Sequence, residues 1–165
     1  MISKIISGGQ VGADVAGLKV AMDLGLQTGG MVPNGWKTKI GPKPQLAKLG
    51  LIEHPTSTSY VPRTKWNVKN SDATIRFAYN FSSPGEIATY KAITQYNKPY
   101  FDVDLYLLET KENLYMLDVV KFFEDNNVSV LNVAGNAGKT KSDTTKIYNL
   151  VRSSLKLYIE KYNLS

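Results

Sequence analysis

The chain has 165 residues, of which 42% are hydrophobic and 21% charged, a length and composition typical of one globular domain with a real core. Disorder and fibrous repeats are thereby excluded, and the absence of cysteine excludes disulfides, thiolate metal sites and cysteine nucleophiles. The net charge of +6 favours anionic partners, and because the lysines are scattered without interleaved aromatic residues, we expect phosphorylated metabolites and not nucleic acid.

No apolar run approaches the roughly 18 residues that a membrane-spanning helix needs. The first residues, MISKIISGGQ, also lack the charged, apolar and cleavage regions of a secretory signal. We therefore expect a cytoplasmic protein without a membrane partner, made of a single domain over residues 1–165.

The chain begins with the pattern of a strand, a glycine turn and a helix. Residues 2–7 are an apolar run that ends in two glycines, and from Asp14 to Gly25 the apolar residues recur at helical spacing. Residues 26–32 predict a second strand. Residues 33–44 are rich in glycine, proline and lysine and predict a loop that is long enough to be functional.

The residues near position 84 predict a helix start. Ser83 can cap the helix, Pro84 suits its first position, and Glu86 stands where a capping box has an acidic residue. Asp72 stands at the entry to the apolar run that precedes this start, so it should lie at the beginning of a strand.

The remaining elements alternate in the same way. They are predicted at residues 59–70 (helix), 73–78 (strand), 84 to about 97 (helix), 99–103 (strand), 114–125 (helix), 128–134 (strand) and 144–162 (helix). This alternation predicts an α/β, Rossmann-like fold of three layers, in which helices cover both faces of a mainly parallel sheet of five or more strands.

Three glycine-containing loops follow predicted strands, at residues 7–14, 82–86 and 135–140. Ligands of such sheets bind beyond the carboxyl ends of the strands, where glycine lets backbone amides approach an anion and the next helix adds its positive end. A single loop of this kind is weak support, because many strand-to-helix turns need glycine for geometry only. Three loops at equivalent places predict a phosphate site.

Two common nucleotide motifs are excluded by spacing. Gly138-Lys139-Thr140 follows a strand, but a P-loop needs a glycine five positions before Gly138, where Val133 stands. Residues 8–12 do not form G-x-G-x-x-G, and no acidic residue ends the second strand. ATPase, GTPase and ordinary hydride-transfer activities are therefore disfavoured.

Asp14 and Arg63 each allow more than one interpretation. Asp14 can contact a ligand or cap its own helix. Arg63 and Asn67 are four residues apart and share one helix face, so Arg63 can direct its fork at a phosphate, be solvated, or pair with Asp72.

The histidine and the tryptophans favour ordinary structural roles. His54, the only histidine, has no serine or carboxylate constellation near it in sequence and is interpreted as a loop residue and not a general base. Trp36 and Trp66 can stack on a base, although core packing is the commoner fate of tryptophan.

Several segments resemble the putative molybdenum carrier family. They are residues 6–14, 29–35, 60–64, 67–68, 71–74 and 131–135, which keep the same order over nearly the whole chain. That family belongs to the SLOG group of Rossmann-like proteins, with the cytokinin-activating phosphoribohydrolases and the ligand-sensing domains of some antiviral effectors. The resemblance implies a homo-oligomeric binding protein, with its ligand over the first glycine loop and the loop that holds Gly85.

The chain departs from the family pattern in the loop that holds Gly85. Where the family tends to have Gly-Thr-x-x-Thr, this chain has a glutamate at position 86, and a carboxylate there would repel a phosphate unless it caps its helix. In the phosphoribohydrolases a glutamate stands three residues after the Gly-Thr pair. Thr89 occupies that place here, so the resemblance implies that the catalytic carboxylate is missing.

The leading hypothesis is a non-catalytic protein that holds or sequesters a phosphate-bearing, nucleotide-like small molecule. The ligand would be a cyclic nucleotide, an ADP-ribose-type signal, or molybdenum cofactor as cargo. The alternative is a nucleotide phosphoribohydrolase or N-glycosidase in which Glu86, Asp14 or Asp72 supplies the carboxylate. The predicted ligand contacts, with no catalytic or metal-binding residue among them, are Gly8, Gly9, Gln10, Val11, Gly12, Asp14, Pro33, Arg63, Asn67, Ser83, Gly85, Glu86, Thr89, Gly135, Asn136 and Lys139.

Overall fold

A six-stranded parallel sheet forms the centre of the computed structural model, which describes residues 1–111 and 113–165. In spatial order the strands are β5 (Leu51–Glu53), β2 (Gln27–Val32), β1 (Lys4–Ser7), β8 (Val130–Gly135), β6 (Ala73–Ala78) and β7 (Tyr100–Asp104). All five neighbouring pairs run parallel. The predicted parallel sheet is therefore confirmed.

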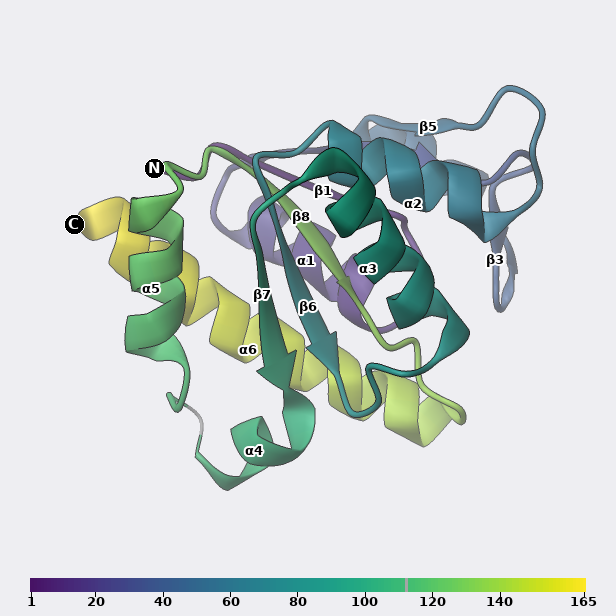
Figure 1. The fold of residues 1–165 in the computed structure, drawn as a ribbon. Coiled ribbons are helices and arrows are strands. Elements are labelled where there is room, and N and C mark those ends of the chain that lie inside the picture. The colour runs from purple at the N-terminus through teal and green to yellow at the C-terminus, as the bar shows by residue number, and fades with distance from the viewer. Residues whose placement is uncertain (112) are drawn as a thin grey trace.

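Helices cover both faces of the sheet, as expected for three layers (Figure 1). One face carries α1 (Ala13–Asp23), α5 (Met116–Asp125) and α6 (Lys141–Leu164), with α6 packed against both of the others. The other face carries α2 (Tyr60–Lys69) and α3 (Pro84–Tyr96), packed against each other. Because both faces are covered, the internal strand β6 is buried along its whole length.

The predicted loop at residues 33–44 contains more structure than its composition indicates. It holds the antiparallel hairpin β3 (Lys37–Thr38) and β4 (Gly41–Pro42) and the start of the 3₁₀ helix η1 (Pro44–Leu49). The short strand β5 and the short helix α4 (Leu105–Thr110) were also not predicted. Elements of two to six residues are too short for a hydrophobic period to develop, so only tertiary contacts reveal them.

Helix α6 begins earlier than its apolar pattern indicates. The Thr140 hydroxyl accepts from Asp143 N, and the Asp143 carboxylate accepts from Thr140 N, which makes a capping box. The helix therefore starts at Lys141, before the predicted start at residue 144, because its first turn is polar and has no apolar pattern. Within the described ranges, no helix combines the length and the apolar character that a membrane crossing requires.

The last strand of the chain, β8, lies in the middle of the sheet between β1 and β6. From β1 the order continues outward through β2 to β5, and from β6 it continues the other way to β7. The loops after β1 and β6 therefore diverge on either side of β8, which is the switch point where such sheets bind ligands. At the opposite edge the two chain ends meet, because Ile2 N donates to Asn163 Oδ1 over 2.8 Å.

Candidate functional site

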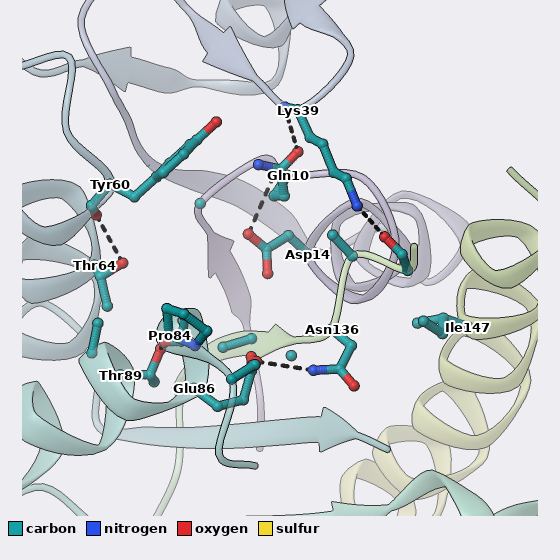
Figure 2. A pocket seen from close by; sticks show the side chains of 18 of the residues that line it. Gln10, Asp14, Lys39, Tyr60, Thr64, Pro84, Glu86, Thr89, Asn136 and Ile147 are labelled. Carbon is teal, nitrogen blue, oxygen red and sulfur yellow. Dashed lines mark hydrogen bonds between the residues drawn. The ribbon is translucent and has the colours of Figure 1, made fainter. Parts of the chain in front are cut away.

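A cavity of about 780 Å³ opens at the carboxyl ends of β1, β6 and β8 (Figure 2). This volume lies within the usual range for small-molecule sites. Its walls are formed by the loops that follow these strands, by α2 on one side, and by the first turns of α3 and α6. The cavity thus lies at the switch point of the sheet.

Arg63 of α2 is a largely buried cation in the wall of the cavity. Its side chain is 12% exposed, and its Nη1 donates to Asp14 Oδ2 over 3.3 Å. The guanidinium also lies 5.3 Å from the centre of the Tyr60 ring. Its Nε is buried and has no hydrogen-bond partner within the described residues. A guanidinium has five N–H donors, so Arg63 keeps donors for a group in the cavity.

Gly8 is what allows Arg63 to reach this position. A Cβ at residue 8 would coincide with Arg63 Nη1 and would approach Asp14 Oδ2 to 2.9 Å. The glycine after β1 therefore makes room for a side chain from α2 that is far away in sequence. The absence of a side chain at Gly8 thus allows the guanidinium of Arg63 to lie close to the backbone, where the sequence predicted the close approach of a ligand.

Asp14, in the first turn of α1, is a buried carboxylate that faces this guanidinium. Its Oδ2 accepts from Gln10 N over 3.2 Å and from Arg63. The pKa of Asp14 is raised to about 6, chiefly by burial and to a smaller extent by the nearby Glu86, while Arg63 and the hydrogen bond from Gln10 N oppose the shift. The capping interpretation of Asp14 is wrong, because Gly12 is the N-cap of α1 and no side chain caps that helix.

A second polar cluster joins the loops after β6 and β8. Glu86 Oε2 accepts from the Ser83 hydroxyl and, over 2.9 Å, from Asn136 Nδ2 (Figure 2). Asn136 Oδ1 accepts from Tyr79 N over 2.8 Å. Asn136 therefore fixes the exit of β6 and the Glu86 carboxylate at once.

The predicted capping box at α3 is wrong, although the helix start is correct. Ser83 is the N-cap and Pro84 the first helical residue, but the Ser83 side chain makes no cap hydrogen bond. It donates to the Glu86 carboxylate instead. The first amides of α3 therefore remain without a side-chain acceptor, at the wall of the cavity.

Arg76 of β6 holds the first turn of α3 from beneath. Its Nη1 donates to Glu86 O over 2.9 Å, while Nε and Nη2 form a bidentate pair with Asp102 over 2.7 and 2.6 Å. The rings of Phe81, Tyr90 and Tyr100 surround the guanidinium at 5.0 to 5.7 Å. Arg76 thus positions the helix turn that carries Glu86 without lining the cavity.

The hairpin β3–β4 reaches the rim of the cavity through Lys39. Lys39 N donates to Gln10 Oε1 over 2.9 Å, and its ammonium donates to Gly138 O in the loop before α6 (Figure 2). The opposite rim carries Tyr79 and Glu109, whose side chains are hydrogen-bonded, and Glu109 pairs with Lys146 over 2.7 Å. The predicted functional loop at residues 33–44 therefore contributes Lys39 to this rim.

The structure brings most of the predicted contacts together. Those that line the cavity are Gly8, Gln10, Asp14, Arg63, Asn67, Ser83, Gly85, Glu86, Thr89, Gly135, Asn136 and Lys139. Whether each of them touches a ligand stays a prediction. Lining residues that the sequence reasoning missed include Lys39, Tyr60, Thr64, Tyr79, Asn80, Tyr106, Asn132 and Lys146. Tyr79 and Asn80 could have been found, because they directly follow a strand that was predicted correctly.

Gly9, Val11, Gly12 and Pro33 do not line the cavity, which corrects their predicted placement. A Cβ on Gly9 would meet the Leu46 side chain at 2.8 Å, and one on Gly12 would meet Asn136 O at 2.5 Å, so both glycines face the protein.

Some amides of this first glycine loop also donate within the chain. Gly9 N donates to Ser7 Oγ over 3.3 Å and Val11 N to Gln10 Oε1 over 3.1 Å. Pro33 is buried, and its carbonyl oxygen accepts from Trp36 N over 3.1 Å to form a turn.

Asp72 lies at the opposite edge of the sheet. Its Oδ2 accepts from Ser129 N over 2.9 Å and from Val130 N over 2.7 Å, at the start of β8. It neither pairs with Arg63 nor supplies a carboxylate to the cavity. Asp72 therefore drops out of the alternative hydrolase hypothesis.

His54 and the two tryptophans lie outside the cavity lining. His54 Nδ1 accepts from Ser57 N over 2.8 Å and so holds its own loop. Trp36 packs on the small core cluster that includes Leu18 and Val32. Within residues 1–111 and 113–165, no group of three or more metal-ligating side chains comes together.

Comparison with known proteins gives one family and one solved structure. The model of the Circularly permutated YpsA SLOG family matches residues 5–159. None of the curated proteins matches the chain. The crystal structure of the putative molybdenum carrier protein from Syntrophus aciditrophicus SB is 31% identical, covers 96% of this chain and 95% of that chain, and superposes with a TM-score of 0.79. A circular permutation agrees with the central place of the last strand, β8, and with the adjacent chain ends.

Proposed function

Because this chain belongs to the Circularly permutated YpsA SLOG family, we propose that it binds and holds a phosphate-bearing, nucleotide-like small molecule in the cavity, without converting it. Family membership and the solved neighbour support a role connected with a nucleotide or cofactor. We propose in addition that this molecule carries a phosphate and that the protein holds it without converting it.

Arg63 is the observation that carries this proposal. A buried guanidinium with one ion pair and an unpartnered Nε is costly, because each unsatisfied buried donor costs about 1–3 kcal/mol. Nε is enclosed, so an anionic oxygen in the cavity would accept from the Nη groups at the end of the side chain, and phosphate oxygens match the geometry of the guanidinium fork.

The first turn of α3 supports an anion from a second element. No side chain caps this helix, so the N–H groups of Gly85 and Glu86 and the positive end of the helix are available at the cavity wall. Lys139, exposed at the rim, adds a further positive charge. Phosphates are thus expected at Arg63 and α3 and less at the first glycine loop, where the amides of Gly9, Gln10 and Val11 have partners within the chain.

Two kinds of cargo satisfy the same chemistry. A cyclic nucleotide or ADP-ribose-type molecule would be sequestered, whereas molybdenum cofactor, a pterin with a phosphate, would be carried. The solved neighbour is described as a putative molybdenum carrier protein. Since the chain has no cysteine, and the described part of it no cluster of three metal-ligating groups, a molybdenum cargo would be held through its pterin phosphate.

Native mass spectrometry of the purified protein tests the proposal, followed by denaturation and identification of the released molecule. We expect a retained small molecule with a phosphate group, and its loss in Arg63→Met. Arg152→Met is the matched control, because Arg152 pairs with Asp23 on the far side of α1 and does not line the cavity. A phosphate-free cargo, or full retention in Arg63→Met, would contradict the proposal.

One observation favours the alternative hydrolase. Asp14, with a pKa raised to about 6 chiefly by burial, shares the cavity with Glu86, and a pair of carboxylates can divide acid and electrostatic roles in cleavage of a glycosidic bond. The test is release of adenine from adenosine 5′-monophosphate. Turnover that is lost in both Asp14→Asn and Glu86→Gln would establish the enzyme and replace the binding proposal.

A further inference from the structure

Two buried carboxylates line a cavity that we propose to bind an anion. Asp14 is 6% exposed and Glu86 is 5% exposed, and they stand on the first turns of α1 and α3 (Figure 2). Carboxylates only accept hydrogen bonds when ionised, and they repel a phosphate. A site for a bare anion would therefore be lined by hydrogen-bond donors alone. The presence of Asp14 and Glu86 indicates that the ligand also has groups that donate hydrogen bonds.

Hydrogen bonds within the chain use only one oxygen of each carboxylate. Asp14 Oδ2 accepts from Gln10 N and Arg63 Nη1, and Glu86 Oε2 accepts from Ser83 and Asn136. Within the described ranges no group donates to Asp14 Oδ1 or Glu86 Oε1. Neither oxygen is among the fully enclosed atoms without a partner, so both remain open to a molecule in the cavity.

We propose that Asp14 Oδ1 and Glu86 Oε1 accept hydrogen bonds from sugar hydroxyls, so that the cavity selects a ribosyl phosphate over a phosphate alone. This inference rests on the proposed function and adds a second chemical requirement to it. The anion is taken by Arg63 and the first turn of α3, and the ribose lies between the carboxylates. Both residues act in specificity, and neither is required to react.

Hydroxyl donors explain the site better than a cation does. Each carboxylate already has a donor beside it, namely Arg63 for Asp14 and Asn136 for Glu86, so a neutral donor completes the set without excess positive charge. The described residues bring no third metal-ligating group to these two. A hydroxyl that donates to a carboxylate also makes one of the stronger hydrogen bonds found in proteins.

The test is calorimetric binding at pH 7.5 of three probes that share adenine and a 5′-phosphate. They are adenosine 5′-monophosphate, its 2′-deoxy analogue and its 2′,3′-dideoxy analogue. We expect the ribonucleotide to bind at least tenfold more tightly than the dideoxynucleotide, and this ratio to fall toward one in Asp14→Asn and in Glu86→Gln. Asp118→Asn, an exposed acidic residue on α5, is the control and should keep the ratio.

The outcomes separate this inference from the proposed function. Equal binding of all three probes would overturn the sugar selection and leave phosphate binding intact. A ratio unchanged in folded Glu86→Gln and Asp14→Asn, verified by circular dichroism, would also overturn it. Absence of binding by these probes, by ADP-ribose and by inorganic phosphate, together with a native mass spectrum that shows only a phosphate-free cargo, would overturn the proposed function and the inference together.

Discussion

The surroundings of Arg76 and Arg63 differ, although both arginines are largely buried on the α2–α3 side of the sheet. Arg76 makes a bidentate pair with Asp102, donates to Glu86 O and is surrounded by three aromatic rings. Arg63 has one ion pair, with Asp14 at 3.3 Å, and within the described residues no group accepts from its enclosed Nε or from its Nη2. The first guanidinium is completed by its own chain, and the second is incomplete without a further molecule.

This difference shows where the chain gives up stability for function. Removing one partner of a fully hydrogen-bonded buried ion pair greatly destabilises the folded protein. A buried charge with unused donors already lowers the stability of the free protein, and a ligand that accepts from those donors restores it. Substitutions near Arg76 should therefore lower the stability of the fold, and substitutions near Arg63 should lower the affinity for the ligand. Variants in both regions test this difference.

The largest effect on stability is expected from Arg76→Met. It leaves Asp102 and Glu86 O without their donor and should lower the free energy of unfolding by about 3–5 kcal/mol. Urea denaturation measures the loss. Arg63→Met should cost less, because its single ion pair is longer, at 3.3 Å, and Asp14, whose pKa is already raised to about 6, can take up a proton when it loses its partner. Equal losses of unfolding free energy in the two variants would show that the two arginines contribute equally to stability, against the difference described above.

The protonation of Asp14 is expected to affect stability over a defined pH range. Its pKa is about 6 when folded and 3.8 in the unfolded reference, so between these values the folded state binds more protons. The stability that Asp14 contributes is therefore fully present below pH 3.8 and is lost as the pH rises through 6, by about 3 kcal/mol in total.

The variant Asp14→Asn isolates this contribution. The difference in unfolding free energy between wild type and variant should change in that direction between pH 4 and pH 7.5, measured by denaturation at each pH. A difference that is constant with pH would show that folding does not shift the pKa of Asp14.

Gly8→Ala should act on binding and not on the fold. A Cβ would coincide with the mobile end of the Arg63 side chain, which can swing away, and residue 8 does not have a positive φ. Ligand affinity should fall at least tenfold, about 1.4 kcal/mol, although every charged residue is still present. Titration of the wild-type ligand into Gly8→Ala and Arg63→Met should give similar losses. Unchanged affinity would place the anion elsewhere.

The smallest effect is expected at the opposite edge of the sheet. Asp72→Asn keeps an acceptor for Ser129 N and Val130 N but removes its charge, so the loss of stability should be about 1 kcal/mol or less. Ligand affinity should not change, because Asp72 lies at the entry of β6. Weakened binding, measured by calorimetry, would contradict the separation of the two edges.

Much of the fold could be predicted because its signals are local. The strand at residues 73–78 matches β6 at both ends, since a continuous apolar run needs no distant partner to be recognised. The hairpin at Lys37–Pro42 escaped prediction because its two-residue strands are stabilised only by each other and by contacts such as Lys39 with Gln10. Residues of the candidate site were predicted where they stand at strand ends, as for Gly8 and Gly135, or at the start of the next helix, as for Gly85.

The sequence by itself determined the layers, the parallel sheet and the edge at which the cavity opens, because these follow from hydrophobic period and turn chemistry among neighbouring residues. Only the tertiary structure decided which polar groups meet. Arg63 reaches Asp14 across 49 positions, and Asn136 reaches Glu86 across 50. Such pairings depend on burial and on the space beside Gly8, which no local pattern encodes. Through those pairings one guanidinium is left incomplete and two carboxylate oxygens are left open.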